Sequence, residues 1–251
     1  MRAFAKELVD LQPDVILASN TPATGALQRE TCMIPIVFQL VSNPVGEGFI
    51  ASISRPGGNI TGLINAEASL AGKWLELLTE IAPGVQRAAI MFNPDNAPGG
   101  GSYYLPPFEE AARLLKVEPI TAPVHNDADI ETVMTSLGRE PRGGLVVPVD
   151  AFTSHHRELI ILLAARHNVP TVYSQSRPIR DCGLLSYGPN MVDNYRRSAT
   201  YVDRILRGAK PSELPVQLPI KFEMALNAKT AKALGLTVPQ SILLRADEVI
   251  E

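Results

Sequence analysis

The sequence alternates short runs rich in Val, Ile and Leu with longer segments whose apolar residues recur at helical spacing. Runs of strand length lie at residues 15–19, 35–41, 59–64, 87–92, 117–124, 143–149, 170–174 and 183–188. Helices are expected around them, at residues 2–11, 22–30, 46–54, 70–81, 104–115, 127–138, 153–168 and 192–208. Strands that alternate with amphipathic helices form parallel sheets buried on both faces. The alternation therefore predicts an α/β protein.

The composition narrows the class of function. The 251 residues are 45% hydrophobic and 20% charged, with a formal net charge of -3, which suits one large or two smaller globular domains. The chain has no run of Lys and Arg and lacks the basic surface that nucleic-acid binding requires. No apolar run approaches the roughly 18 residues of a membrane-spanning helix, and no secretory leader precedes the first helix.

Polar residues gather where the predicted strands end. In open parallel sheets, ligands bind beyond the carboxyl ends of the strands. The segments after the strands are rich in Ser, Thr, Asn and Asp, at residues 19–22, 42–44, 93–96, 149–152 and 174–176. They include Asn43 and Asn93, and we expect them to line a cleft for a small polar ligand.

The helix that follows the first strand begins at a Thr-Pro pair. Thr21 suits the N-cap and Pro22 the first helical position, where the missing N–H of proline costs nothing. The unpaired N–H groups of a helix start favour a bound anion, and the small side chain of Ala23 leaves room for one. The alternative is that Thr21 only caps the helix.

Motifs of common catalytic and cofactor sites are absent from the sequence. It holds no G-x-S-x-G elbow, phosphate loop, H-E-x-x-H or G-x-G-x-x-G after a strand, and Gly99–Gly101 is interpreted as a flexible connection. Cys32 and Cys182 are too few and too distant in sequence for a disulfide framework or zinc site. The adjacent His155 and His156 point about 100° apart on a helix, so we expect neither a metal nor a cofactor.

One enzymatic alternative uses the two cysteines. Cofactor-independent amino-acid racemases pair two α/β lobes that each supply one thiol. Cys32 lies before its strand, however, at the end away from the expected ligand, where a thiol cannot reach a substrate. Racemisation is therefore the weaker hypothesis.

Several longer segments resemble the ABC-transporter substrate-binding protein family. They are PDVILASNTPATGALQRET, IPIVFQLVSNPVGEGFIASISRPGGNITGL, AGKWLELLTEIAPGVQRAAIMFNPDNAP and PVQLPIKFEMALNAKTAKALGLTVPQSILLRADEVIE. The similarity covers essentially all 251 residues and is strongest to a branch of periplasmic components, some of which bind aromatic amino acids. RPGGNITG and the closing KALGLTVP are its most specific motifs.

The resemblance implies two Rossmann-like lobes of the type I periplasmic-binding-protein kind, joined by three hinge crossovers. By this analogy, the first lobe comprises residues 1–61 and 188–214, and the second comprises residues 62–187 and 215–251. Gly62 and the proline-bounded run at 215–219 suit hinge strands that absorb dihedral change. Closure of the lobes on a ligand would exclude water.

The resemblance also implies roles for residues in both lobes. Ser19, Asn20 and Thr21, with Ala23 beside them, would hold a ligand carboxylate, and Asp150 would accept the ammonium group or else cap the next helix. The aromatic residues would stack on the ligand, close over it or belong to the core, and are Tyr103, Tyr104, Phe152, Tyr173 and Tyr187. Trp74 has the spacing of a core residue.

The chain departs from the family in two places. Asn43 stands where many relatives carry an aspartate, which puts recognition of a cation at that loop in doubt. Relatives also begin earlier, with a signal peptide and a strand-helix-strand unit before the helix that starts here at Met1. We therefore expect either a mis-assigned start codon or a weakened, truncated first lobe.

The expected function is that of a non-catalytic receptor in the periplasm. It would capture a small carboxylate-bearing ligand, such as an amino acid, in the cleft between the lobes and deliver it to the membrane permease of an ABC importer. No nucleic-acid partner is expected. Besides the racemase, the remaining alternative is the ligand-sensing domain of a regulator, since the same two-lobe fold serves there.

Overall fold

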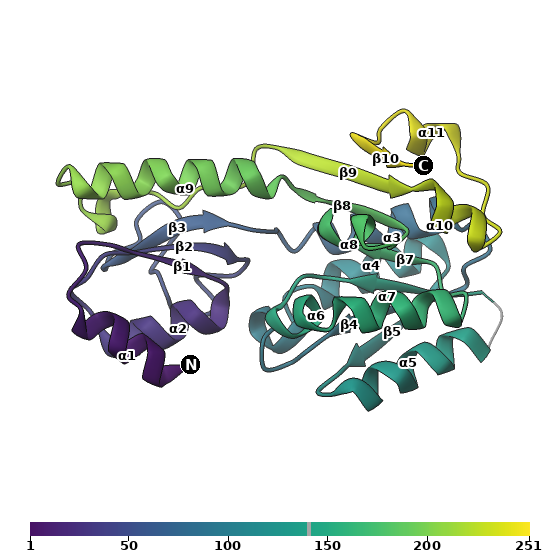
Figure 1. The fold of residues 1–251 in the computed structure, drawn as a ribbon, viewed down its shortest axis with the longest axis horizontal. Helices are drawn as coiled ribbons and strands as arrows, with labels where there is room; N and C mark the ends of the chain where they lie inside the picture. Colours follow the sequence, from purple (N-terminus) through teal and green to yellow (C-terminus); the bar gives the residue numbers. More distant parts are fainter. Residues whose placement is uncertain (140–141) are drawn as a thin grey trace. The chain divides into compact units, whose positions relative to one another are not determined.

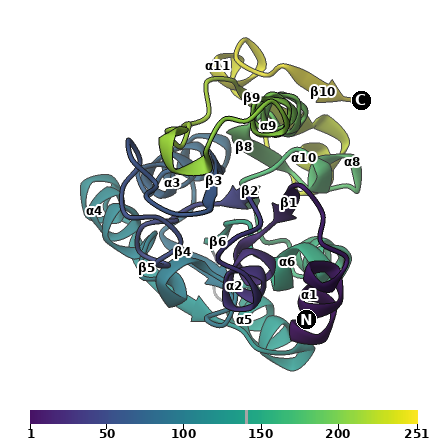
Figure 2. The same cartoon turned by 90° about the vertical axis from the view of Figure 1, so that its left-hand side faces the viewer.

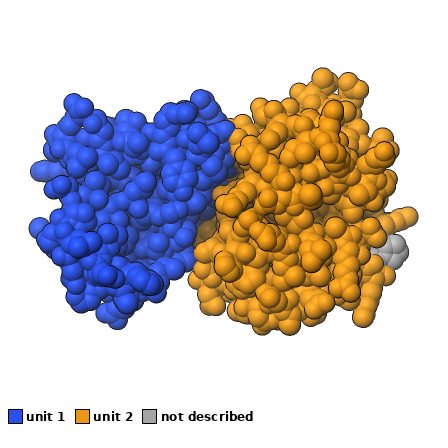
Figure 3. Space-filling view, in the orientation of Figure 1, with its two compact units in different colours: residues 1–67, 189–221 blue, residues 68–188, 222–251 orange. Residues whose placement is uncertain are grey.

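The computed structural model describes residues 1–139 and 142–251. The chain forms two compact units, shown in different colours in Figure 3. Unit 1 comprises residues 1–67 and 189–221, and unit 2 comprises residues 68–188 and 222–251. The chain therefore passes from one unit to the other three times.

Unit 1 is built on a three-stranded parallel sheet. Its strands, in spatial order, are β1 (Ile16–Ser19), β2 (Ile36–Val41) and β3 (Ile60–Ile64). The helices α1 (Arg2–Asp10) and α2 (Thr21–Glu30) cover one face, and α9 (Met191–Leu206) covers the other (Figures 1 and 2). A short 3₁₀ turn, η2, follows at Pro211–Glu213. Since every strand is parallel, the carboxyl ends of all three strands lie at one edge of the sheet.

Unit 2 holds a seven-stranded sheet in the order β10-β9-β8-β7-β6-β4-β5. The strands are β4 (Arg87–Phe92), β5 (Glu118–Pro123), β6 (Gly143–Val147), β7 (Thr171–Tyr173), β8 (Leu185–Pro189), β9 (Phe222–Asn227) and β10 (Glu248–Ile250). Strands β4 to β8 are parallel. Asn227 at the end of β9 donates its N–H to Leu184 directly before β8, and Asn190 directly after β8 donates to Lys221 before β9, so these two strands run in opposite directions.

Helices cover both faces of this sheet (Figure 1). On one face, α3 (Leu70–Ile81) packs beside α4 (Leu105–Leu115). On the other, α5 (Asp127–Arg139) packs beside α7 (Arg157–Arg166). The short elements are η1 (Pro98–Gly101), α6 (Ala151–His155), α8 (Arg177–Arg180), α10 (Ala228–Ala233) and α11 (Gln240–Leu243). None of the helices within the described ranges is long and apolar enough to span a membrane.

The predicted α/β class with parallel sheets is confirmed, but two predicted helices are wrong. Residues 46–54 form consecutive turns, because Gly48 adopts a positive φ of 70° and the Asn43 side chain accepts the Gly46 N–H. The helix expected at 153–168 is two helices, α6 and α7, which meet at the non-helical His156. Gly99 and Gly100 form a left-handed turn within η1.

Three residues with an expected role in packing or movement can now be placed. Trp74 is fully buried, as its spacing predicts. Tyr104 packs against Trp74 with ring centroids 5.5 Å apart and is also buried, so it is a core residue and not part of a lid. Gly62 lies inside β3, where a Cβ would overlap the backbone of Phe38, so close strand packing and not hinge freedom requires a glycine there.

Candidate functional site

The start of α2 differs by one residue from the sequence prediction. Asn20, not Thr21, is the N-cap, and its Oδ1 accepts the Ala23 N–H at 2.9 Å. Asn20 has a φ of 81° and a ψ of 161°, a backbone region that is occupied almost entirely by glycine, so Asn20 is strained at this position. The Asn20 N–H bonds to the Gln39 carbonyl, which fixes this corner to β2.

The groups left open at this corner are hydrogen-bond donors. Pro22 has no N–H and the Ala23 N–H is used by the cap, so Thr21 carries the one backbone N–H of the first helical turn that has no partner among the described residues. Within residues 1–139 and 142–251, the Ser19 hydroxyl donates no hydrogen bond and the Asn20 amide nitrogen makes none. Ser19, Asn20 and Thr21 are all half-buried. A set of donors at the positive end of a helix suits an anion such as a carboxylate.

Ala23 and Asn43 lie at the same edge of the sheet in unit 1. Ala23 is half-buried in the first turn of α2 and adds no polar group. Asn43 follows β2, and its Oδ1 accepts the Gly46 N–H at 3.0 Å. The Asn43 side chain therefore shapes the turn after β2, with Gly46 packed closely against it.

Two buried amides in unit 1 were missed by the sequence reasoning. Gln39 in β2 and Asn65 directly after β3 are 0% and 1% exposed. Gln39 Oε1 and Asn65 Oδ1 have no hydrogen-bond partner among the described residues. The signal for Gln39 was present in the sequence, since a lone amide interrupts the apolar run IVFQLV.

Asp150 caps α6 and also joins two strands of unit 2. Its Oδ1 accepts the Thr153 N–H at 2.7 Å, and its Oδ2 accepts the Asn93 N–H at 3.0 Å. The Asp150 N–H in turn donates to the Thr153 hydroxyl oxygen, which completes a capping box. Burial raises the pKa of the Asp150 carboxyl, while these N–H donors act in the opposite direction. The Phe152 N–H and the Thr153 side chain also act on this carboxylate, so Asp150 is held by donors from both the end of β4 and the first turn of α6.

Both the nitrogen and the oxygen of the Asn93 side-chain amide form hydrogen bonds. Its Nδ2 donates to the Val124 carbonyl at 2.8 Å, and its Oδ1 accepts from the Asp95 N–H and the Asn96 side chain. It therefore ties the end of β4 to the end of β5. This network positions the backbone N–H that Asp150 accepts.

The three predicted aromatic contacts lie in different environments. Phe152 stacks on His156 with ring centroids 3.9 Å apart, and Tyr187 stacks on Phe222 at 5.8 Å. Both Phe152 and Tyr187 are half-buried. Tyr173 is 3% exposed and belongs to the core.

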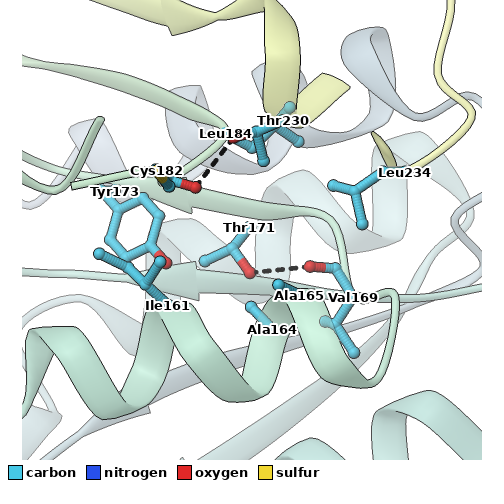
Figure 4. A pocket seen from close by; sticks show the side chains of 11 residues that line it. Ile161, Ala164, Ala165, Val169, Thr171, Tyr173, Cys182, Leu184, Thr230 and Leu234 are labelled. Atoms are coloured by element: carbon cyan, nitrogen blue, oxygen red, sulfur yellow. Dashed lines mark hydrogen bonds between the residues drawn. The ribbon is translucent and has the colours of Figure 1, made fainter. Parts of the chain in front are cut away.

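Tyr173 lies in a small pocket beside α7, close to Ile161 and Cys182 (Figure 4). Its hydroxyl makes no hydrogen bond with the described residues, and burial raises its pKa. A wider hollow of about 510 Å³ adjoins this pocket, between α7 and α10. It opens at the start of β8, whereas Asp150 follows the end of β6, so the two lie at opposite ends of the sheet.

The two cysteines do not lie at the edges that carry the polar residues. Cys32 precedes β2 and Cys182 precedes β8, and both are exposed and unpaired. Each thiol thus lies at the amino end of a strand in its own unit, which removes the geometric basis for two-thiol chemistry at the carboxyl ends. The described part of the chain also holds no group of three His, Cys, Asp or Glu side chains that could bind a metal.

Comparison with known proteins gives matches that extend over almost the whole chain. The family model described as "ABC transporter substrate binding protein" matches residues 1–250. A curated relative, the tyrosine-binding protein of Clostridioides difficile (strain R20291), is 22% identical over 235 residues, which cover 94% of this chain and 67% of that protein.

Two solved structures show the same fold over 99% of this chain. A conserved domain protein from Vibrio cholerae O1 biovar El Tor has a TM-score of 0.90, 25% identity and 82% of its chain covered. An ABC domain from Streptococcus pneumonia, solved in complex with L-Trp, has a TM-score of 0.89, 23% identity and 85% of its chain covered. The fold is therefore that of the type I periplasmic binding proteins.

Proposed function

The chain belongs to the family of ABC transporter substrate-binding proteins, and from this premise we propose that it captures an amino acid, preferably an aromatic one, for import. Proteins of this family bind solutes and are not enzymes. The preference for an amino acid is supported by the tyrosine-binding relative and by the L-Trp complex of the streptococcal protein.

The donor set at the start of α2 is the observation that carries this proposal. The Thr21 N–H and the Asn20 amide nitrogen can only donate to a ligand, and the hydroxyls of Ser19 and Thr21 can also donate. An amino-acid carboxylate needs several donors at once and gains from the positive end of a helix. In the proposed complex, these three residues of unit 1 bind the carboxylate.

Unit 2 holds further residues that we propose as ligand contacts. Asp150 is the buried acid that accepts the ligand ammonium, and its raised pKa marks a carboxylate that gains from a nearby cation. The half-buried rings of Phe152 and Tyr187 stack on an aromatic ligand side chain. Asn93 holds Asp150 in place and does not touch the ligand.

We place the protein at the outer side of a membrane, in the periplasm, as the receptor of an ABC importer. ABC substrate-binding proteins typically work outside the cytoplasm. The partner would be a membrane permease that accepts the loaded protein and takes up the ligand.

A thermal-shift screen of the twenty amino acids tests this function. L-Tyr and L-Trp are expected to raise the melting temperature by several degrees at ligand concentrations about 100 times Kd, because a ligand that binds only the folded state stabilises it by RT ln(1 + [L]/Kd). Tryptamine lacks the carboxylate and indole-3-propionate lacks the ammonium group, so both are expected to bind more weakly. If aromatic amino acids leave the melting temperature unchanged while other solutes raise it, the aromatic amino-acid assignment is wrong.

A further inference from the structure

Gln39 occupies a position in β2 where an apolar residue would be expected. It is fully buried, and the strand around it reads IVFQLV. Gln39 is paired with Ser19 across β1 and β2, and its Nε2 donates to Ser19 Oγ at 2.7 Å. The Gln39 amide therefore contacts the hydroxyl of Ser19, which is the residue of the proposed carboxylate site that belongs to a strand.

This hydrogen bond determines what Ser19 offers to a ligand. A serine hydroxyl has one proton to donate and accepts through its oxygen. Because Gln39 supplies a proton, the oxygen of Ser19 must accept it, and the Ser19 proton is left for another partner. Within the described ranges the Ser19 hydroxyl donates to no protein group, and Ser19 is half-buried, so its proton is available to a ligand.

The cost of burying Gln39 argues against a purely structural role. Its Oε1 is enclosed without a hydrogen-bond partner among the described residues. A buried acceptor without a donor destabilises a fold, and an apolar side chain of similar size would avoid this penalty. Positions that break a local rule of stability concentrate at functional sites.

We propose that Gln39 is a positioning residue that fixes Ser19 as a proton donor to the carboxylate of the bound ligand. This inference rests on the function proposed above. Gln39 itself does not touch the ligand. Because the Gln39 amide nitrogen donates to the Ser19 oxygen, the Ser19 hydroxyl proton cannot point toward Gln39 and is directed away from the sheet.

A double-mutant cycle on ligand affinity tests the inference. Isothermal titration calorimetry with L-Trp is performed on the wild type, Gln39→Met, Ser19→Ala and the double variant. Gln39→Met is expected to weaken binding about fivefold in the wild-type background and less than about twofold in the Ser19→Ala background, because residues in direct contact are energetically coupled. Gln39→Met conserves side-chain volume, and its urea unfolding midpoint is expected to equal or exceed that of the wild type.

The outcomes separate this inference from the proposed function. An equal loss of affinity in both backgrounds would mean that Gln39 shapes β2 for reasons unrelated to Ser19, and the inference would be wrong although the protein binds L-Trp. Unchanged affinity of Gln39→Met would also overturn it. If the wild type binds no amino acid, the proposed function fails first, and the inference loses its premise.

Discussion

The carboxylate of Asp150 accepts the backbone N–H of Asn93 at 3.0 Å, so one side chain joins the segments that follow β6 and β4. These strands are neighbours in the sheet of unit 2. The second oxygen of Asp150 holds the first turn of α6 through Thr153. Asp150 therefore has a structural role whether or not a ligand is bound, and its contributions to stability and affinity have to be measured separately.

Replacement of Asp150 by alanine is expected to destabilise the protein by about 2 kcal/mol, because the helix cap and the bond to Asn93 are both lost. Urea denaturation of the ligand-free protein measures this change. Asp95→Ala is the matched control, since the Asp95 side chain is 80% exposed and a surface change costs within about 0.5 kcal/mol. Equal stability of the two variants would show that the Asp150 carboxylate is not a cap in solution.

The raised pKa of Asp150 predicts how its contribution depends on pH. A carboxyl group whose pKa is higher in the folded state binds its proton more tightly there, so its contribution to stability falls as pH rises from the ordinary value near 3.8 through the folded pKa. Asn is an equally good N-cap and does not titrate. The stability of the wild type relative to Asp150→Asn should therefore decline from pH 4 to neutral pH, as measured by urea denaturation. A difference that grows with pH would contradict the raised pKa.

At position 20, glycine is expected to give a more stable protein than alanine, which is the reverse of their order in the interior of a helix. Its φ of 81° is accessible to glycine at little cost but strains alanine. Both Asn20→Gly and Asn20→Ala lose the bond to the Ala23 N–H, yet Asn20→Ala is expected to be the less stable by about 1 kcal/mol. Thermal unfolding of the two ligand-free variants gives the comparison. The opposite order would mean that the backbone relaxes away from positive φ at no cost.

The fold class could be predicted from the sequence because the period of apolar residues changes between strand and helix, and tertiary packing follows that period. The local assignments that were wrong depend on single residues. Thr21-Pro22 has the composition of an N-cap followed by a first helical position, but Asn20 takes the cap because its backbone turns at positive φ immediately after β1. Residues 46–54 have helical spacing, but two glycines and the Asn43 side chain favour turns.

The candidate site was harder to predict than the fold. Polar residues after strands can be read from the sequence, and Ser19, Asn20 and Thr21 do lie together at the start of α2. The pairing of Gln39 with Ser19 could not be predicted from the sequence, since it depends on the register between β1 and β2. The cap that Asp150 forms with Thr153 is local, but its bond to the Asn93 N–H joins residues that are 57 positions apart in the chain and could not be predicted from the sequence.

Gly62 is expected to be intolerant of any side chain. A Cβ at this position would overlap the backbone and ring of Phe38 in the neighbouring strand. Gly62→Ala should destabilise the protein by about 1 to 3 kcal/mol, the usual cost of overpacking. Gly58→Ala is the control, because a Cβ there meets nothing within 4 Å. If Gly62→Ala unfolds at the same urea concentration as Gly58→Ala, the close approach of β2 and β3 does not exist in solution.

Trp74 is the only tryptophan in the sequence, and it reports on one of the proposed ligand contacts. Its indole N–H donates to the Tyr187 carbonyl at 2.7 Å, and the ring is fully buried. Trp74→Phe leaves that carbonyl without its donor and is expected to cost about 1 to 3 kcal/mol in urea denaturation. In the wild type, L-Tyr that stacks on the Tyr187 ring should change the fluorescence emission of Trp74. The ligand would contact the side chain of Tyr187, and the Trp74 indole is hydrogen-bonded to the carbonyl of the same residue. Unchanged emission at saturating L-Tyr, with binding verified by calorimetry, would place the ligand away from Tyr187.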